Sequence, residues 1–376
     1  MTLSLHWFLP TAGDSRDVAA SGPGAHHRAP TLDYLAQVAR AAEQVGFDGV
    51  LTPTGTWCED AWIVTAALLA HTRRLRFLVA LRPGLLSPTL AAQMASTYQR
   101  VSGGRLALNV VTGADAQELR RFGDHLDKQR RYARTGEFLE VLRGAWGPEP
   151  LDHFGDHYDV EGATTRLAPD PPPAIYFGGA SAAAERVAAR HADVYLMWGE
   201  TPEMLRERIA RVRALAAEHE RTLRLGLRLH MISRERARDA WAEADRLLAA
   251  MDPDAVERTR EALTASESEG QRRMAALSHG GDSLVIAPNL WAGIGLVRGG
   301  AGTALVGSHA EVAERIAELH ELGFDELILS GHPHIEEAYA FGEGVLPILR
   351  ERGLAAPAAD RGDGAFVPGS YVALRR

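Results

Sequence analysis

The sequence predicts a single (β/α)8 TIM barrel with insertions, and two observations lead to this fold class. Short runs with strand character alternate with helical patterns along the whole chain, which favours parallel strands joined by helical crossovers. Eight such units follow one another, and no linker divides the chain into halves. A doubly wound open sheet is the alternative fold for the same alternation.

The predicted strands occupy, in chain order, residues 3–8, 49–51, 75–80, 105–110, 175–177, 194–197, 223–232 and 326–329. The helices between them are indicated by apolar residues that recur every three or four positions. This spacing marks the first helix at Leu32, Leu35, Val38, Ala42 and Val45, and the helix before the seventh strand at Met204, Ile209, Val212 and Leu215.

Three insertions interrupt this pattern, at residues 11–30, 144–170 and 253–281. The third begins with a helical pattern and becomes a polar, charged stretch, so we expect a mobile lid there. After residue 353 the composition shifts to Ala, Pro, Gly and Asp. The prediction is therefore a barrel domain over 1–353 and a flexible C-terminal tail over 354–376.

Composition excludes several classes of partner. A net charge of −8 provides no basic surface for nucleic acid. The N-terminus lacks the features of a signal peptide, and the most apolar window, 61–70, has about half the length of a membrane span. The single cysteine, Cys58, rules out an intrachain disulfide and fits a reducing compartment. We expect a cytoplasmic protein that binds neither nucleic acid nor membrane.

A glycine-rich run at 289–307 contains six glycines and one charged residue, Arg298. Small residues allow close approach of the backbone to a ligand, and this guanidinium has no carboxylate near it in the sequence, which indicates an anion site. Arg228 and His230 lie two positions apart in the seventh strand and therefore share one face. The alternatives are a buried strand packed through small residues, and a polar pair satisfied inside the barrel.

The reactive side chains of a barrel lie at the C-terminal ends of its strands, and Trp198 and His332 are expected there. Together with the two arginines and His230 they suit a small strong anion and proton transfer. Trp198 could instead belong to the core, and Cys58 could be an inert buried thiol. The nearby His334 suggests a metal, but no matching ligand set follows at the usual spacing, so we predict no metal site.

A phosphate cradle is predicted after the fifth strand, where residues 178–181 form a glycine turn before an alanine-rich helix. The backbone N–H groups at the start of that helix and the Ser181 hydroxyl could bind a phosphate. The motif alone is weak, because strand, glycine turn and helix recur in most α/β proteins.

Taken together, residues 7–10, 53–55, 58–62, 77–83, 109–113, 176–179, 228–230 and 289–307 resemble the two-component alkanesulfonate monooxygenases, which belong to the bacterial-luciferase-like flavin superfamily. The resemblance extends from residue 3 to about residue 350. It implies a homotetramer or homodimer that receives reduced FMN (FMNH2) from a separate NAD(P)H-dependent FMN reductase. With O2, such an enzyme would cleave the C–S bond of a small organosulfonate and release sulfite and an aldehyde.

The resemblance also implies roles for individual residues. The sulfonate would be bound by Arg228 and Arg298, and the reaction site would be lined by His230, Trp198 and Cys58. The flavin would be held by Asn109, Thr112, Tyr132, Gly179, Ala180 and Ser181.

The chain departs from the family pattern at two places. Where these enzymes usually have Ser-Gly-Tyr-Pro-His, this chain has His332 in place of the tyrosine, and Ala180 precedes Ser181 where two serines are usual. An imidazole changes charge between about pH 5 and 8, so we expect activity to fall as His332 loses its proton. Two alternatives stay open: a flavin-dependent oxidoreductase of the same superfamily that transfers hydride, and a non-catalytic flavin- or anion-binding barrel.

Overall fold

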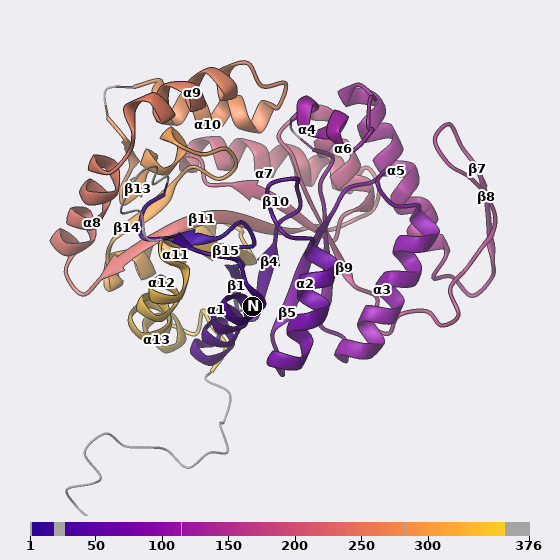
Figure 1. The fold of residues 1–376 in the computed structure, drawn as a ribbon, viewed down its shortest axis with the longest axis horizontal. Helices are drawn as coiled ribbons and strands as arrows, with labels where there is room; N and C mark the ends of the chain where they lie inside the picture. Colours follow the sequence, from indigo (N-terminus) through magenta and orange to yellow (C-terminus); the bar gives the residue numbers. More distant parts are fainter. Residues whose placement is uncertain (1, 19–26, 114, 282, 358–376) are drawn as a thin grey trace, which may run out of the picture.

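The computed structural model describes residues 2–18, 27–113, 115–281 and 283–357, and it contains a closed barrel of eight parallel strands (Figure 1). These strands are β1 (Ser4–Phe8), β4 (Gly49–Thr52), β5 (Arg76–Leu81), β6 (Leu106–Val110), β9 (Ala174–Gly178), β10 (Val194–Trp198), β11 (Arg224–Arg234) and β15 (Glu326–Ser330). Each pairs with its neighbours in the ring, and β15 closes the ring by pairing with both β11 and β1. The predicted barrel is confirmed and the open sheet is wrong.

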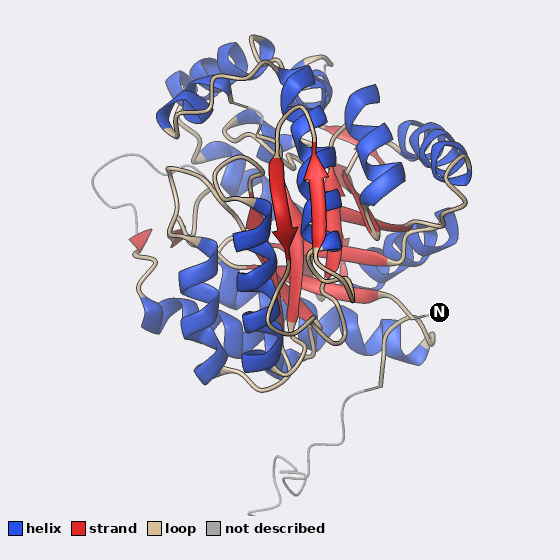
Figure 2. Cartoon of the chain, turned by 90° about the vertical axis from the view of Figure 1, so that its right-hand side faces the viewer, coloured by secondary structure: helices blue, strands red, loops and turns tan. Residues whose placement is uncertain are grey.

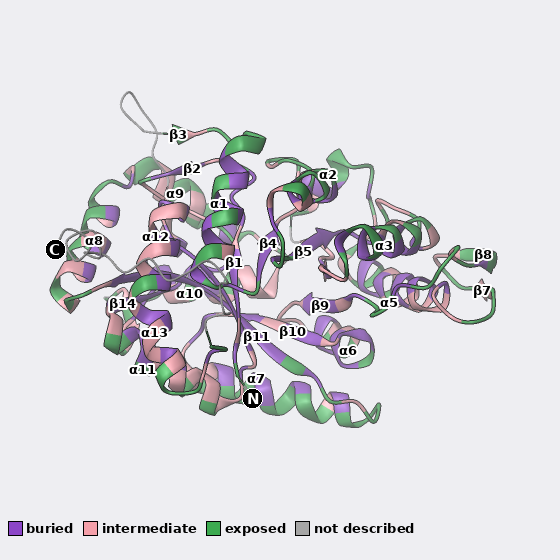
Figure 3. Cartoon of the chain, turned by 90° about the horizontal axis from the view of Figure 1, so that it is seen from below, coloured by how far each residue is buried: buried purple, intermediate pink, exposed green. Residues whose placement is uncertain are grey.

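Each of the eight predicted runs forms one of these strands, with ends displaced by at most two residues. Alternate side chains point into the barrel, where Leu51, Leu78, Ala107, Val194 and Ile328 form an apolar cluster. The opposite faces, with Trp7 and Phe177, pack against the surrounding helices in the main core. Figure 3 shows the buried strands at the centre and the exposed residues on the outer faces of the helices.

Helices enclose the strands (Figure 2). The outer layer contains α1 (Leu32–Val45), α2 (Ala61–Leu68), η1 (Leu69–His71), α3 (Pro88–Ser102), α5 (Lys128–Gly144), α6 (Ala182–His191), α7 (Pro202–Ala217), α11 (His309–Leu322), α12 (His334–Ala340), η3 (Phe341–Val345) and α13 (Leu346–Glu351). In α1 the residues Leu35, Val38 and Ala42 are buried as the spacing predicts, whereas Leu32 remains 44% exposed. Within the described ranges, no helix is long and apolar enough to cross a membrane.

The long strand β11 supports an added sheet beside the barrel. Its first half pairs with β10 and β15, and its second half pairs with β14 (Ala304–Ser308). Beyond β14 follow β13 (Leu290–Trp291) and β12 (Val285–Ala287). The glycine-rich run therefore includes β13, η2 (Gly293–Leu296) and β14, and it lies against the C-terminal half of β11.

The predicted insertions take three forms. The first contains β2 (Asp14–Ser15) and β3 (His27–Arg28), and residues 19–26 lie outside the described part. The second is the hairpin of β7 (Leu151–Phe154) and β8 (Asp159–Ala163), which projects from the barrel in Figure 1. The third forms two helices, α9 (Pro253–Thr264) and α10 (Glu269–His279), after α8 (Ala237–Ala249). A short helix, α4 (Ala116–Arg121), follows β6.

The predicted tail begins with packed residues. The carbonyl oxygen of Leu354 accepts a hydrogen bond from Leu3 N at 2.7 Å, and Ala355 is 5% exposed. Residues 358–376, the greater part of the predicted tail, lie outside the described residues.

Candidate active site

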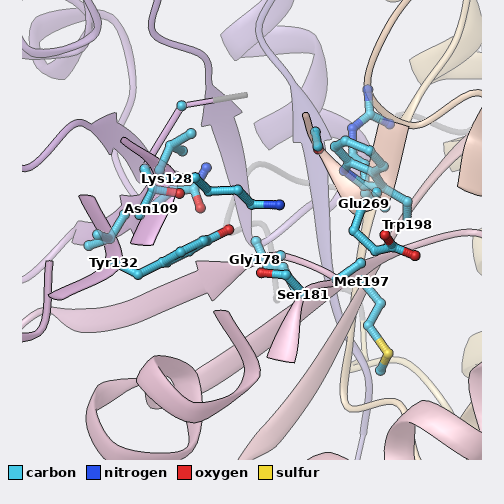
Figure 4. Close-up of a pocket in the computed structure, with 18 of the residues that line it drawn as sticks. Asn109, Lys128, Tyr132, Gly178, Ser181, Met197, Trp198 and Glu269 are labelled. Atoms are coloured by element: carbon cyan, nitrogen blue, oxygen red, sulfur yellow. The ribbon is translucent and has the colours of Figure 1, made fainter. Parts of the chain in front are cut away.

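A cavity opens at the C-terminal ends of the barrel strands, where the sequence predicts the reactive residues. Its lining includes Asn109, Thr112, Tyr132, Gly179, Ala180, Ser181, Trp198 and Arg228. In Figure 4, Asn109, Lys128 and Tyr132 lie on one side of the pocket and Trp198 and Glu269 on the other, with Gly178 and Ser181 between them. The structure thus brings together all six predicted flavin-binding residues.

The start of α6 forms one end of this cavity. Ser181 is the residue that caps α6, and its hydroxyl accepts a hydrogen bond from Ala184 N at 3.3 Å. Gly179 has a φ of +154°, and a Cβ there would come within 2.5 Å of the Ala184 side chain, so the close packing of turn and helix requires glycine. The remaining N–H groups at this helix end are suited to a phosphate.

Two cations beside the cradle did not follow from the sequence reasoning. Lys128 and Arg131, both from α5, line the same cavity as Ser181. Lys128 is the only lysine in the chain. A signal for them was present, because Lys128, Arg131 and Tyr132 follow the helix-capping residue Asp127 at the spacing of one helical face. Their charges and the end of α6 together fit a phosphate group such as that of FMN.

The start of α10 covers the cavity from the opposite side. Glu267 and Gly270 contribute to its lining, and the carbonyl oxygen of Glu267 accepts a hydrogen bond from Lys128 Nζ at 2.8 Å. Arg273 of α10 donates two hydrogen bonds, of 2.7 and 2.8 Å, to the buried carboxylate of Glu200. The insertion predicted as a lid is therefore in contact with the barrel mouth in this structure.

Arg228 lies at the floor of the cavity, 6% exposed, and faces the barrel interior. Its Nη2 donates to Ser330 Oγ at 2.8 Å and its Nη1 to the carbonyl oxygen of Leu229 at 2.6 Å, while its guanidinium carbon stands 4.8 Å from the centre of the Phe8 ring. Burial, and then repulsion by Arg298, lower the pKa of Arg228. All its partners are neutral.

The other buried arginines have carboxylate partners. Arg82 lies 2.7 Å from Glu118, Arg208 lies 3.0 Å from Glu200, and Arg131 lies 3.9 Å from Glu267. Among the buried arginines of the described residues, only Arg228 has no carboxylate within 4.0 Å. A buried and uncompensated charge is costly, so this position is suited to an incoming anion.

His230 and Arg298 continue the site from Arg228. His230 is 1% exposed, and its Nε2 lies 3.4 Å from Arg298 Nη1 and 3.2 Å from the carbonyl oxygen of Ala301. Arg298 is partly exposed and has no carboxylate within 4.0 Å in the described chain. Burial, followed by the charges of Arg228 and Arg298, lowers the pKa of His230 well below its usual value, so this ring is neutral at pH 7.

His332 stacks on His230, with ring centres 5.6 Å apart and planes 15° apart. Both nitrogens of its ring are buried and have no hydrogen-bond partner in the described structure. Burial, then His334 and Arg298, lower the pKa of His332 well below its usual value. This direction opposes the expectation that activity falls as His332 loses its proton between about pH 5 and 8, because burial and nearby positive groups favour the neutral ring.

The nearest approach to a metal site within the described residues is the group Asp14, His332 and His334, whose ligand-type atoms lie within 4.8 Å of one another. The oxygens of Asp14 already accept hydrogen bonds from His334 Nδ1 and His334 N, both at 2.8 Å, and from the Tyr34 hydroxyl. These bonds make Asp14 the partner that orients His334, and they occupy the oxygens that a metal would need.

Cys58 stands apart from the cavity lining. Its Sγ lies 3.7 Å from the carbonyl oxygen of Gly55, and its surroundings include the ion pair between Arg82 and Glu118. Burial raises the pKa of this thiol, so it is protonated at neutral pH.

Comparison with known proteins identifies the family. Residues 3–326 match the model of the luciferase-like monooxygenase family. Similar solved structures include a riboflavin lyase (RcaE) with modified FMN and riboflavin (TM-score 0.82, 23% identity, covering 96% of this chain and 94% of that one). A second is the EDTA monooxygenase EmoA from Chelativorans sp. BNC1 (TM-score 0.74, 19% identity, covering 96% of this chain and 96% of that one). A third is the long-chain alkane monooxygenase LadA (TM-score 0.75, 19% identity, covering 100% of this chain and 99% of that one).

At these identities the similarity to solved structures shows only a shared fold. The family is shown by the match to the family model, which covers most of the chain. This protein belongs to the luciferase-like monooxygenase family, a family of flavin-dependent enzymes.

Proposed function

We propose that this chain is a reduced-flavin-dependent monooxygenase that uses O2 to cleave the C–S bond of an organosulfonate, giving sulfite and an aldehyde. The observation that carries the proposal is the placement of Arg228. It is a buried cation with no carboxylate partner in the described chain, it lines the candidate flavin cavity, and Arg298 lies close to it through His230. Two guanidinium groups can bind the oxygens of a sulfonate by charge-assisted hydrogen bonds.

The cavity also fits the cofactor. The flavin phosphate would bind at the start of α6 through Ser181, with Lys128 and Arg131 supplying positive charge. Asn109, Thr112, Tyr132, Gly179 and Ala180 would contact the rest of the molecule. Reduced FMN, delivered by a separate NAD(P)H-dependent FMN reductase, would supply the electrons with which O2 is activated.

Other residues of this protein would shape the reaction site and close it. Trp198 would form a wall between flavin and substrate, and His230 would contribute a polar group beside Arg298. The helices α9 and α10 would act as the lid that excludes water, held at the barrel mouth by the pair of Arg273 and Glu200. Cys58 has no part in this proposal, because it does not line the cavity.

The test supplies chemically reduced FMN and measures sulfite release and O2 uptake with a series of alkanesulfonates. We expect O2-dependent sulfite release with the best substrate, at most one sulfite per O2 because free reduced FMN also consumes O2, and no NADH oxidation by the purified protein alone. Arg228→Ala is the matched control, because it should retain flavin binding and lose sulfite release. Turnover of NADH without a reductase, or product formation without O2 uptake, would indicate hydride transfer and overturn the proposal.

A further inference from the structure

Ser330 joins two residues of the anion site that come from another strand. It is the last residue of β15, and its hydroxyl is 0% exposed. It accepts a hydrogen bond from Arg228 Nη2 at 2.8 Å and lies 2.9 Å from His230 Nδ1. Since a hydroxyl has one proton to donate, its position decides which nitrogen of His230 can carry the ring proton.

The other nitrogen of the ring indicates where that proton lies. His230 Nε2 is 3.2 Å from the carbonyl oxygen of Ala301, which can only accept a hydrogen bond. A neutral imidazole has one N–H, and placing it on Nε2 leaves Nδ1 free to accept the hydroxyl proton of Ser330. The donors then follow one direction, from Arg228 through Ser330 and His230 to Ala301.

The opposite tautomer is less compatible with these surroundings. It would leave the Ala301 carbonyl without this donor and the Ser330 hydroxyl without this acceptor, where Ala301 is 4% exposed and Ser330 fully buried. One contact favours the opposite tautomer: its Nε2 could accept a hydrogen bond from Arg298 Nη1, which lies 3.4 Å away. Arg298 is partly exposed, so solvent or an anion can accept its hydrogen bonds, whereas Ala301 and Ser330 are buried.

We propose that Ser330 is a positioning residue that holds the ring proton of His230 on Nε2, so that His230 acts as a neutral hydrogen-bond donor to the substrate anion beside Arg298 and not as a general base. The inference rests on the proposed function for the identity of the anion. The tautomer itself is a property of the free protein. The Nε2–H that donates to the carbonyl oxygen of Ala301 can be shared, as a three-centre hydrogen bond, with an anion bound by Arg298 Nη1, whose nitrogen lies 3.4 Å from Nε2.

The first experiment reads the tautomer directly. Protein labelled with 15N-histidine is examined by two-bond 1H–15N correlation NMR, and the signals of His230 are assigned by their loss in His230→Gln. We expect the pattern of a neutral ring protonated at Nε2 in the wild type, and a changed pattern in Ser330→Ala. A wild-type ring protonated at Nδ1, or one unchanged by Ser330→Ala, overturns the inference.

The second experiment separates donor from base. Ser330→Ala should raise the KM for the best sulfonate about tenfold with a smaller change in kcat, because the anion loses an ordered donor. The control is Ser233→Ala on β11, since Ser233 is also buried and its Oγ lies 3.2 Å from the Nδ1 of another histidine, His309. We expect no change of KM in that control. Equal effects of both serine variants contradict the proposal.

A third variant tests the role of His230 itself. The amide of His230→Gln can still donate a hydrogen bond but is no base at any ordinary pH. We expect it to keep turnover within about tenfold of the wild type and His230→Ala to lose far more. Equal inactivity of the two variants overturns the donor role. If wild type releases no sulfite yet shows the Nε2–H ring, the proposed function fails and the tautomer assignment stands.

Discussion

Two buried charges near opposite ends of the barrel, Glu326 and Arg228, have different kinds of partner. Near the N-terminal ends of the strands, Glu326 is 1% exposed and is surrounded by partners. His6 Nε2 lies 3.1 Å from its Oε2, the Tyr176 hydroxyl donates to the same oxygen at 2.5 Å, and Arg224 Nη1 lies 2.7 Å from Oε1. At the C-terminal ends, Arg228 has only neutral partners in the described chain.

This difference indicates that the paired charge of Glu326 serves stability, whereas the unpaired charge of Arg228 is suited to ligand binding. Burial raises the pKa of Glu326, but His6, Tyr176 and Arg224 outweigh that effect and lower it below the usual value, as expected for a carboxylate with positive and hydrogen-bonding partners. At the other end burial lowers the pKa values of Arg228, His230 and His332, and neighbouring positive groups lower them further. Asp14 opposes this effect at His332 but does not outweigh it. Charge left uncompensated at the C-terminal face of a barrel is the arrangement expected of a binding site.

The largest effect should come from removing the uncompensated charge. Arg228→Ala should lower kcat/KM for sulfite release by about a hundredfold or more, since a desolvated charge contact is worth roughly 2 to 5 kcal/mol. The melting temperature should hold or rise, because no carboxylate partner is left behind. Arg228→Lys should restore little, since an ammonium lacks the planar fork. Wild-type turnover in Arg228→Ala would place the anion site elsewhere.

The opposite result is expected at the other end of the barrel. Glu326→Gln should lower the free energy of unfolding by about 3 kcal/mol at pH 7, because the buried partners lose their carboxylate, while the KM of the folded enzyme is nearly unchanged. Since the folded-state pKa of Glu326 is lowered, its contribution is present above the usual pKa of 4.5 and is lost as the pH falls through the folded value. Denaturant unfolding at pH 7 and pH 4 checks this. The comparison breaks down if the variant is as stable as wild type at pH 7.

A smaller effect is expected at the phosphate end of the cavity. Lys128→Ala should weaken the binding of reduced FMN about fivefold, which corresponds to roughly 1 kcal/mol for one partly exposed charge. Because Lys128 is the only lysine, reductive 13C-methylation labels its Nζ and the N-terminal amine alone. The lysine signal should shift when reduced FMN is added under anaerobic conditions. An unmoved signal together with unchanged affinity would remove Lys128 from the cradle.

The smallest effect concerns His332. Because burial and the nearby positive groups lower its pKa well below the usual value, the neutral ring is favoured at pH 7, and His332→Tyr should leave the pH profile of kcat/KM unchanged between pH 6 and 8. The relative rates with short and long alkanesulfonates should change several-fold, since a longer phenol replaces the imidazole. A pH limb in that range that disappears in His332→Tyr would show that the ring titrates after all.

Much of the fold and part of the site could be predicted from local pattern. Strand runs, glycine turns and helical spacing are set by neighbouring residues, so the sequence predicted all eight barrel strands. The spacing of Arg228 and His230 predicted that they share one face, and both contact Ser330 in the structure. The cradle before α6 was also visible, because Ser181 follows a glycine turn at the start of a helix. Lys128 and Arg131 were missed because the spacing of α5 does not say which way its face points.

The sequence by itself determined the order of strands and helices and the kinds of charged groups that the strand ends present, because these depend on residues close together in the chain. Only the tertiary structure decided which charges have partners. Glu326 acquires His6 and Arg224, and Ser330 meets Arg228 and His230, through closure of the ring between segments about a hundred residues apart or more. The pKa of His332 depends in the same way on burial and on Arg298, since the energy of a charge is set by everything around it and not by its neighbours in sequence.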